Sequence, residues 1–340
     1  MIIREMSPDD FESFRVLYRD VHGYNRPHVV DRWRLLETPK GICPTAVADD
    51  NGRMAGLYTN WPVEISLGNE TVLGAQTMDV MTHPEYRRQG LFTKLALFCY
   101  EMAMKMGYEV LYGFPNPFSY PGFIKCLNWD HTGDITHWVR PIKPSCHPNV
   151  PSIIGTFADL AMTVVPKGSR GDYLFHIGKP SDNQLEPLLE SWCAEKDICC
   201  TARTTAWIHW RYSPKSQNNY EWICAFMNEE LLAVAVWGIR NPSGKVAALK
   251  RACLVELLGQ DQNAVRSVLR ETIIRAGANG AASLETLCNV ESVVQSMRRV
   301  GFYCHRKIPF IVRKLTTRNL EANIHNHAAW RIMGGDLDTF

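Results

Sequence analysis

The stretch Thr77-Met-Asp-Val-Met-Thr-His-Pro-Glu-Tyr-Arg-Arg-Gln-Gly-Leu-Phe92 decides the fold of this chain. Its first residues are apolar and favour a strand that ends at His83-Pro84, and a basic turn ending in Gly90 follows. Apolar residues then recur at helical spacing, which predicts a helix from Leu91 to Gly107. A strand, a turn and a helix N-terminus in succession direct several backbone N–H groups and the positive end of a helix dipole at one point. The stretch therefore predicts a site for a phosphate or pyrophosphate.

Arg87 and Arg88 add positive charge to this turn. The alternative is an ordinary turn between a strand and a helix whose arginines are merely solvated, because glycine-containing turns of this kind are common. Spacing alone does not separate the two interpretations.

Length and composition set the class of protein. The chain has 340 residues, 46% hydrophobic and 21% charged, which is typical of a globular protein of two domains. The net charge of +2 comes without a dense basic run, so we expect no nucleic acid partner. No apolar stretch reaches the roughly 18 residues of a membrane span, and the first residues lack a signal-peptide pattern. These observations predict a cytoplasmic protein without membrane contact.

The 11 cysteines are scattered, odd in number and without paired CxxC spacing. This pattern predicts free thiols in a reducing compartment. Several cysteines lie inside apolar stretches and are expected to be buried: Cys99, Cys126, Cys224, Cys253 and Cys288. His325 and His327 form an isolated H-x-H pair, which is weak evidence for a metal, and we expect none.

The two halves of the chain repeat the same landmarks. Asn116 ends an apolar run and the aromatic residue Trp129 follows it. In the second half Asn289 ends an apolar run, and the aromatic residue Phe302 follows it at the same spacing. A repeat of this kind indicates two copies of one structural unit.

Two further landmarks recur at nearly the same offset along the chain. Trp33-Arg34 recurs as Trp210-Arg211. A serine-containing helix start after Ile3 recurs after Ile177. Three landmarks at nearly one offset are difficult to obtain by chance.

We therefore expect an α/β fold made of two tandem copies of a mixed central sheet flanked by helices. The first domain would span residues 1–145 and the second 146–340, joined around Pro141 to Pro151. Each copy would contain an antiparallel meander before its long helix. The expected strands are residues 45–48, 54–58 and 63–66 in the first copy, and 221–226, 231–238 and 247–258 in the second.

The residues from Val80 to Leu91 resemble the acyl-CoA-binding segment of the GCN5-related N-acetyltransferase (GNAT) superfamily. That segment is a hydrophobic strand, then His-Pro-x-Tyr-Arg, then Arg/Gln-x-x-Gly-x-Gly/Ala. The resemblance implies that backbone groups of Val80 and Met81 bind the pantetheine arm of acetyl-CoA or another acyl-CoA. It implies that the turn binds the pyrophosphate through Arg87, Arg88, Gln89, Gly90, Leu91 and Phe92. Phe92 departs from the pattern, which has a small residue at this position.

The same resemblance implies a role for Asn116, just past the second central strand. In such enzymes a residue here often contacts the CoA arm. The alternative is that Asn116 caps the following helix, and Asn289 at the same place in the second copy is consistent with that alternative.

The second copy lacks the phosphate-binding pattern. Residues 259–267 contain no Arg/Gln-x-x-Gly-x-Gly/Ala, and Asp261 places negative charge where a pyrophosphate would bind. We therefore expect the first domain to bind acyl-CoA and the second to be a degenerate copy that shapes the acceptor site. A second, divergent CoA site is the alternative.

Acyl transfer to an amine requires a base for the ammonium and an acid for the departing thiolate. Many GNAT enzymes have a tyrosine acid five residues before the aromatic that ends the short helix, but Ile124 stands there in this chain. Tyr120, one turn earlier, is the substitute candidate, and a packed aromatic is the alternative. Asp79, in an apolar strand, is the candidate base and should be paired or have a raised pKa. A structural hydrogen bond is its alternative.

The acceptor side has weaker candidates. His83 ends the central strand, and Asp134 and His137 follow the short helix. The last residues combine Trp330, two glycines and the acids Asp336 and Asp338, which could return to the cleft to bind an amine or sugar hydroxyls. A simple surface turn is the alternative for this segment.

The resemblance implies an N-acyltransferase that moves an acyl group directly to a primary amine in a ternary complex. The tandem layout is similar to that of enzymes that acylate nucleotide-linked amino sugars, as in polysaccharide biosynthesis. The alternatives are an acetyltransferase of another small amine, such as an aminoglycoside or polyamine, and a non-catalytic acyl-CoA sensor. We expect a monomer or homodimer.

Overall fold

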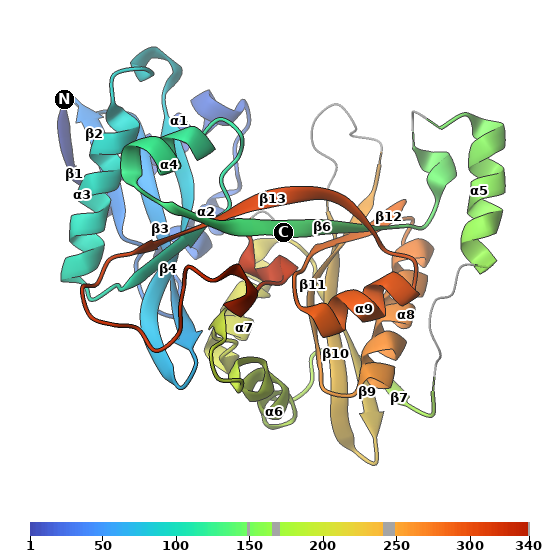
Figure 1. Cartoon of the computed structure of the whole chain (residues 1–340). Coiled ribbons are helices and arrows are strands. Elements are labelled where there is room, and N and C mark those ends of the chain that lie inside the picture. The colour runs from blue at the N-terminus through green and yellow to red at the C-terminus, as the bar shows by residue number, and fades with distance from the viewer. Residues whose placement is uncertain (148–149, 165–170, 241–248, 339–340) are drawn as a thin grey trace. The chain divides into compact units, whose positions relative to one another are not determined.

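The computed structural model describes residues 1–147, 150–164, 171–240 and 249–338. They form two compact units, each a mixed sheet with helices (Figure 1). The first unit consists of residues 1–134, 196–202 and 308–329. The second consists of residues 135–195, 203–307 and 330–340. The predicted α/β class is confirmed in both units.

The first sheet is antiparallel except where its two central strands, β4 and β5, run parallel. A short strand, β8, pairs with the far end of β3. The order is β1 (Ile2–Glu5), β2 (Thr45–Asp50), β3 (Arg53–Leu67), β4 (Glu70–Thr82), β5 (Val110–Gly113) and the end of β13 (Tyr303–Lys314), with β8 (Cys199–Thr201) on β3.

The second sheet has the same plan, with β11 and β12 as its parallel central pair. The end of β6 lies on the outer edge of β12, as the end of β13 lies on β5. The order is β7 (Leu174–Ile177), β9 (Glu221–Met227), β10 (Glu230–Arg240), β11 (Arg251–Gly259), β12 (Ser283–Leu287) and β6 (Asp130–Pro141).

The two units are interleaved in sequence rather than divided at one boundary near residue 145. Strand β6 starts in the first unit and enters the second at Ile135. Strand β13 starts in the second unit and enters the first at Ile308. The sheet of the first copy therefore takes the strand beside β5 from β13, which lies much later in the sequence.

Helices accompany each sheet in corresponding order. A capping box at Ser7 precedes the first helix, and one at Ser181 opens α6. The first unit contains α1 (Phe11–His22), α2 (His28–Leu36), α3 (Leu91–Lys105) and α4 (Tyr120–Leu127). The second contains α5 (Ser152–Val164), α6 (Asp182–Cys193), α7 (Thr205–Arg211), α8 (Gln262–Ala278) and α9 (Glu291–Arg299).

The predicted meander of the first copy is wrong in one respect. Residues 54–58 and 63–66 belong to a single strand, β3, which continues through Pro62. Strand β2 pairs with β3 only as far as Thr59, and β8 joins β3 again at Ile65. Pro62 lies in the interval between them and pairs only with Ala75 of β4, so its missing N–H interrupts no ladder.

The core of the first unit contains a buried polar chain beside α3. The hydroxyl groups of Tyr58 and Tyr100 are 2.8 Å apart, and the indole N–H of Trp129 donates to Tyr100 at 2.7 Å. All three rings are almost fully buried. Because each polar atom has a partner, these large side chains fill the core without an unpaired group.

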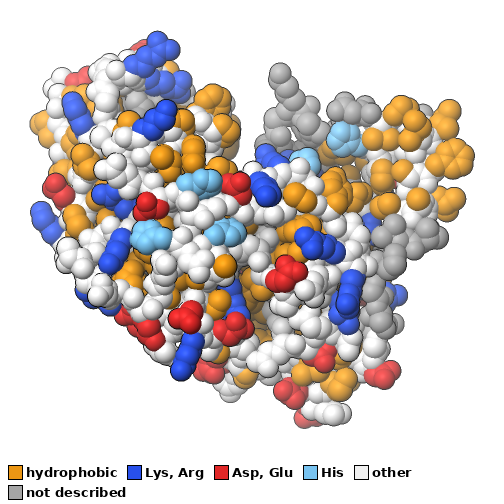
Figure 2. Space-filling view, viewed as in Figure 1, with side chains coloured by type: hydrophobic (Ala, Val, Ile, Leu, Met, Phe, Trp, Pro, Cys, Tyr) orange, Lys and Arg blue, Asp and Glu red, His pale blue; other side chains and the backbone are white. Residues whose placement is uncertain are grey.

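An apolar patch lies on the surface of the second unit. Figure 2 shows hydrophobic side chains gathered over α5, where Ile153, Ile154, Phe157 and Leu160 are exposed.

None of the helices in the described ranges has both the length and the apolar content that crossing a membrane requires. The 11 cysteines are free, and Cys126, expected to be buried, is exposed because it faces outward from α4.

Candidate active site

A bulge in β4 forms the centre of the site. Opposite β3, Leu57 pairs with Met81 and Thr59 with Met78, so β4 has one extra residue at this point. Asp79 has a φ of 46°, in the left-handed region that few residues other than glycine adopt. The bulge therefore re-aims the Asp79 side chain out of the regular strand pattern.

Two arginines hold the Asp79 carboxylate. Arg26 Nη2 lies 3.0 Å from Asp79 Oδ2, and Arg34 Nε lies 3.4 Å from the same atom. Arg26 also pairs with Asp31, which is buried on α2. Burial raises the pKa of Asp79, but the charges of Arg26 and Arg34 outweigh it and hold this pKa below its ordinary value. Asp79 is thus paired, as expected, and is a poor acceptor of protons near neutral pH.

The two central strands separate directly beside this bulge. Parallel pairing of β4 with β5 ends at Gln76 and Tyr112. Beyond that point Thr77 donates to Asn60 at 2.8 Å within the interior. In the described ladders, Met81 pairs on the β3 side only, and Val80 lies in the bulge without a ladder partner. The other edge of both residues faces the gap between the strands. Backbone groups on that edge are available to an extended ligand.

The turn after β4 contains backbone N–H groups that have no hydrogen-bond acceptor among the described residues. A short 3-10 turn, Pro84–Tyr86, leads into Arg88 (φ 64°) and Gly90 (φ 73°), which caps α3. Among the described residues, no acceptor is found for the backbone N–H groups from Arg88 to Thr93. A run of free N–H groups at the start of a 15-residue helix is an anion-binding arrangement.

The side chains of this turn divide into exposed and buried groups. Arg87, Arg88 and Gln89 are exposed beside the unclaimed N–H groups. Leu91 is buried and anchors the start of α3 in the core. The charges can therefore reach a phosphate while the helix start stays fixed.

The departure at Phe92 has a packing explanation. The Phe92 ring lies edge-on to Phe123 at 5.2 Å between centroids. A Cβ placed on Gly122 of α4 would be 2.8 Å from the Phe92 ring. Phe92 therefore points into the core under α4, and the small residue that makes room for it is Gly122 rather than residue 92.

Asn116 caps the segment that leads into α4. Its Oδ1 accepts hydrogen bonds from the backbone N–H groups of Phe118 and Ser119, at 2.9 and 3.0 Å. This geometry supports the capping alternative for the side-chain oxygen. A contact of its amide N–H with a CoA arm stays a prediction.

Tyr120 opens α4 and belongs to a small cluster. Its ring lies edge-on to His131 at 5.5 Å, and His131 Nε2 is 3.0 Å from Asp134. Asp134 is partly exposed, whereas Ile124, at the position of the usual tyrosine acid, packs against the core. Tyr120 and Asp134 thus lie in one group of polar side chains.

Two other acceptor-side candidates are occupied by structural contacts. His83 is buried, and its Nδ1 accepts from the backbone N–H of Glu85, so it caps the 3-10 turn. His137 lies in the second unit, buried 3.3 Å from Glu285, with Arg306 on its other ring nitrogen. Neither imidazole is presented to solvent for an acceptor.

The predicted role of Asp336 in acceptor binding does not fit its position. Asp336 is 2% exposed, and Arg203 donates to both of its oxygens, at 2.6 and 2.8 Å. These bonds lie within the second unit. Asp338 is partly buried near Arg211 of the same unit. The tail is therefore neither a loose surface turn nor a group that reaches an acceptor through Asp336.

Sequence reasoning missed the arginines and one histidine near Asp79. His22, at the end of α1, stacks on Tyr18 at 4.4 Å, and Arg26 lies over Tyr18 at 4.3 Å. Burial and the charge of Arg26 lower the pKa of His22 below its ordinary 6.5, although Asp79 opposes this. A neutral imidazole in this position can accept a proton.

A signal for the arginines is present in the sequence. Arg26 and Arg34 recur as Arg203 and Arg211, at the same offset that relates Asp79 to Glu256. The structure places Arg203 Nε 3.0 Å from Glu256 Oε1, so the Arg–acid pair is repeated in the second copy.

The turn of the second copy has a different cap. Asp261 caps α8, and its side chain accepts from the backbone N–H of Ala264 at 2.7 Å. Tyr173 also donates to this carboxylate. The carboxylate of Asp261 therefore occupies the place that an anion would need, whereas Gly90, the cap in the first copy, leaves that place open.

In the described part of the chain, no group of His, Cys, Asp or Glu side chains is arranged to hold a metal ion.

Residues 2–132 match the family model of the acetyltransferase (GNAT) domain. The chain carries a GNAT acetyltransferase domain. The match spans β1 to the start of β6, which includes the bulge, the gap between the central strands and the turn before α3. This part of the chain is accordingly an acyl-CoA-dependent N-acyltransferase domain of the GNAT type, with an amine as acceptor.

Solved structures extend the likeness of fold to both units. The GCN5-related N-acetyltransferase from Anabaena variabilis ATCC 29413 is similar over 93% of this chain and 73% of that chain, with a TM-score of 0.67 and 9% identity. A conserved protein of unknown function from Enterococcus faecalis V583, a probable N-acyltransferase, is similar over 92% and 72%, with a TM-score of 0.67 and 11% identity. No curated protein matches the sequence.

Replacing Asp79 tests the ion network. Asp79→Asn would leave Arg26 and Arg34 without their shared carboxylate in a nearly buried place, and we expect a loss of about 3–5 kcal/mol in the free energy of unfolding. Urea unfolding at neutral pH measures it. The control is Asp9→Asn at an exposed position, for which we expect a change within about 0.5 kcal/mol.

The pH dependence of the same variant gives a second check. Folding holds the pKa of Asp79 below its ordinary 3.8, so its stabilisation is complete above that value and is lost as the pH falls below it. Between about pH 5 and pH 3 the wild type should therefore lose more stability than Asp79→Asn. Equal losses in both proteins would contradict this assignment.

Proposed function

We propose that this enzyme transfers an acetyl or other short acyl group from acyl-CoA to the primary amine of a nucleotide-linked amino sugar. The transfer is direct, without a covalent intermediate, within a ternary complex of the first copy. The acyl donor class follows from the GNAT domain. The acceptor is the part that is proposed.

The observation that carries the donor half of the proposal is the turn before α3. Its unclaimed N–H groups from Arg88 to Thr93 and the exposed side chains of Arg87 and Arg88 suit a pyrophosphate. The open edge of β4 at Val80 and Met81 lies just before this turn in sequence and suits the amide-containing arm that follows the pyrophosphate in CoA. The two features together match one extended ligand.

The bulge region supports the proton transfer from the amine. Asp79 has a lowered pKa and is engaged by Arg26 and Arg34, so we assign it the positioning of these arginines. His22 is the group we propose as base, because its pKa is lowered and it is neutral near pH 7. Tyr120 remains the proposed proton donor to the thiolate, beside His131.

The residues around His22 support an acceptor that contains a sugar or base ring and a phosphate. The hydroxyl groups of Tyr18 and Tyr24 lie 3.0 Å apart. The Tyr24 side chain is 58% exposed, so its aromatic ring is accessible to a sugar or base. Two arginines lie in the same cluster, and each carboxylate there is already paired with them. This surface offers a polyamine or aminoglycoside few free acidic groups, so we rank these acceptors second.

A non-catalytic acyl-CoA sensor is the candidate from another class. The replacement of the usual tyrosine by Ile124 favours it, because that side chain cannot donate a proton. A sensor would bind acyl-CoA without turnover on any amine.

An acceptor panel distinguishes these functions. Release of CoA should be measured from acetyl-CoA and longer acyl-CoAs with nucleotide-linked amino sugars, free amino sugars, aminoglycosides and polyamines. We expect the highest kcat/KM with a nucleotide-linked amino sugar. Turnover with polyamines alone would replace the proposed acceptor, and tight acetyl-CoA binding without turnover on any amine would favour the sensor.

Reversing the charge of Arg88, in the turn before α3, tests whether this turn binds the pyrophosphate of acetyl-CoA. Arg88→Glu should weaken acetyl-CoA binding by about 10- to 100-fold, because a charge-assisted phosphate contact is replaced by repulsion. Isothermal titration measures the Kd. The matched control is Arg266→Glu in the first turns of α8, which should leave the Kd unchanged. The reverse result would mean that the second copy binds the donor.

The role of His22 predicts a change in the pH profile. With His22 as base, kcat/KM should fall on the acid side as the imidazole is protonated, at a pH below its ordinary 6.5. His22→Gln should lower kcat/KM by about 100-fold or more and remove this limb of the profile. His28→Gln, at an exposed position on α2, should change neither. An unchanged profile in His22→Gln would exclude the histidine as base.

A further inference from the structure

The last described segment of the chain lies in the gap between β11 and β12 of the second unit. Parallel pairing of these strands ends at Cys253 and Glu285. A Cβ placed on Gly334 would be 2.6 Å from the Leu254 carbonyl of β11 and 3.2 Å from the Thr286 hydroxyl of β12. The backbone at Gly334 thus passes between the two strands just beyond the point where they separate.

Asn289, at the end of β12, binds the backbone of this segment. Its Oδ1 accepts from the N–H of Ile332 at 2.9 Å, and its amide N–H donates to the Trp330 carbonyl at 2.8 Å. The next contact is an antiparallel bridge between Cys288 and Met333. Residues 330–333 are therefore held in extended form, and a 3-10 turn, Gly334–Asp336, follows them.

Two arginines hold the rest of the segment. Arg211 donates to the backbone carbonyls of Gly335 and Leu337, at 3.1 and 2.8 Å. Arg203 binds both oxygens of Asp336. All of these groups are buried, so the segment is part of the interior of the second unit and not a surface strand.

The fit at Gly335 is close. A Cβ there would be 2.3 Å from Glu256 Oε1 and 2.3 Å from the Tyr212 hydroxyl, which themselves share a hydrogen bond of 2.6 Å. Neither group can move without breaking the buried network with Arg203. The groove is thus shaped for a glycine at this position.

The groups that hold the segment are the counterparts of groups around the donor site of the first copy. Asn289 corresponds to Asn116, and the gap between β11 and β12 corresponds to the gap between β4 and β5. The Arg–acid pairs correspond in the same way: Arg203 to Arg26, Arg211 to Arg34 and Glu256 to Asp79. The segment therefore occupies, in the second copy, the position proposed for the CoA arm in the first.

We propose that residues 330–338 are an intramolecular ligand of the second copy, which fills its acyl-donor groove and prevents a second acyl-CoA from binding. The inference rests on the proposed function of the first copy for the identity of the groove. Peptide groups of residues 330–333 replace the amide groups of a pantetheine arm, because both are extended chains that present N–H and C=O groups to the strand edges.

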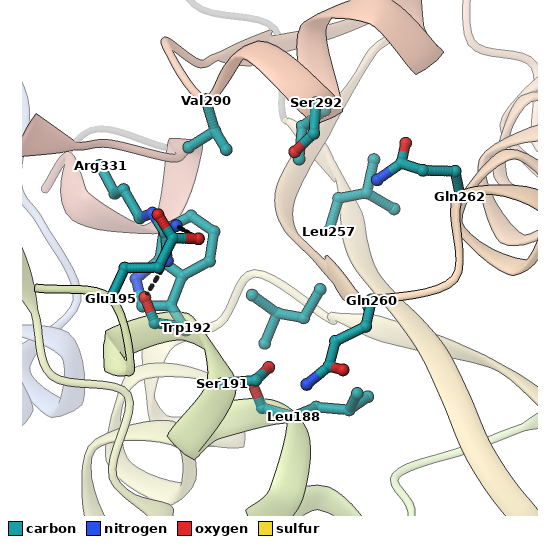
Figure 3. Close-up of a pocket in the computed structure, with 13 residues that line it drawn as sticks. Leu188, Ser191, Trp192, Glu195, Leu257, Gln260, Gln262, Val290, Ser292 and Arg331 are labelled. Carbon is teal, nitrogen blue, oxygen red and sulfur yellow. Dashed lines mark hydrogen bonds and ion pairs between the residues drawn. The ribbon is translucent and has the colours of Figure 1, made fainter. Parts of the chain in front are cut away.

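A cavity of about 220 Å³ remains beside the start of this segment. It lies between α6, the end of β11 and the starts of α8 and α9, and Arg331 borders it (Figure 3). Arg331 donates to the Trp192 carbonyl at 2.6 Å and pairs with Glu195, so the start of the segment is anchored at the cavity wall. Gly259 and Gln260 also line the cavity, and they belong to the turn that corresponds to the phosphate-binding turn of the first copy.

Binding stoichiometry is the first test and uses the full chain. Equilibrium dialysis with saturating acetyl-CoA should give one equivalent bound, and Arg88→Glu should bind much less than the wild type at a concentration near the wild-type Kd. Two equivalents in the wild type would overturn the filled groove. No binding in the wild type would overturn the proposed function, and the position of the segment would then be decided by the next two measurements.

A disulfide tests the position of the segment independently of CoA. Residues paired in an antiparallel bridge have Cα atoms within the range that a disulfide spans, so Met333→Cys should cross-link with Cys288 on mild oxidation. Mass spectrometry of the peptides identifies the bond. The control, Met333→Cys combined with Cys288→Ser, should give none. Absence of the bond in the first variant would overturn the proposal.

Release of the segment is the third test. The variant Asn289→Ala with Gly335→Ala loses the two hydrogen bonds from residue 289 to the backbone of the segment. It also places a Cβ at residue 335 against the carboxylate of Glu256. Trypsin should then cleave after Arg331 about tenfold faster or more, because local opening becomes easier, while the Kd of the first copy for acetyl-CoA stays unchanged. That unchanged Kd shows that the variant remains folded. Rapid cleavage after Arg331 already in the wild type would overturn the proposal.

Discussion

A pair of an arginine and a carboxylate, nearly buried in the first copy and fully buried in the second, lies beside the gap between the central strands. Such a gap leaves one edge of a strand without a partner inside the protein, where unpaired polar groups are costly. In the first copy Arg26 reaches Asp79 at the bulge, and in the second Arg203 reaches Glu256. The pair fixes the helical layer to the strand at the point where the sheet opens. The gap, the bulge and the turn that follows all depend on it.

The two copies differ in the second carboxylate of this network. In the first copy it is Asp31, from the helix that also carries Arg34. In the second copy it is Asp336, from the far end of the chain. Asp31 lies on a neighbouring helix and leaves the gap open for a ligand, whereas Asp336 brings its own backbone into the gap. The segment that supplies the second carboxylate thus differs between the copy with an open groove and the copy with a filled one.

The sequence predicts the strand, turn and helix around Gly90 correctly because their signals are local. The repeat is also visible in the sequence, since Trp33-Arg34 recurs as Trp210-Arg211. The partners of Asp79 were not predicted, because an ion pair between groups so far apart in the chain has no helical or strand periodicity. Their signal in the sequence is the recurrence of Arg26 and Arg34 as Arg203 and Arg211. The prediction of two strands in place of β3 failed at Pro62, whose missing N–H is harmless only because no strand lies beside it there in the described ladders. That arrangement is a tertiary property.

The exchange of β6 and β13 between the units affects the order in which the chain can fold during synthesis. The strand that lies beside β5 is the end of β13, which starts at Tyr303. A ribosome must therefore make the chain as far as Lys314 before the sheet of the first copy is complete. Until then the outer edge of β5 is open to wrong partners, including the same edge of another nascent chain. The duplication thus couples the maturation of the donor-binding half to the completion of the half that follows it.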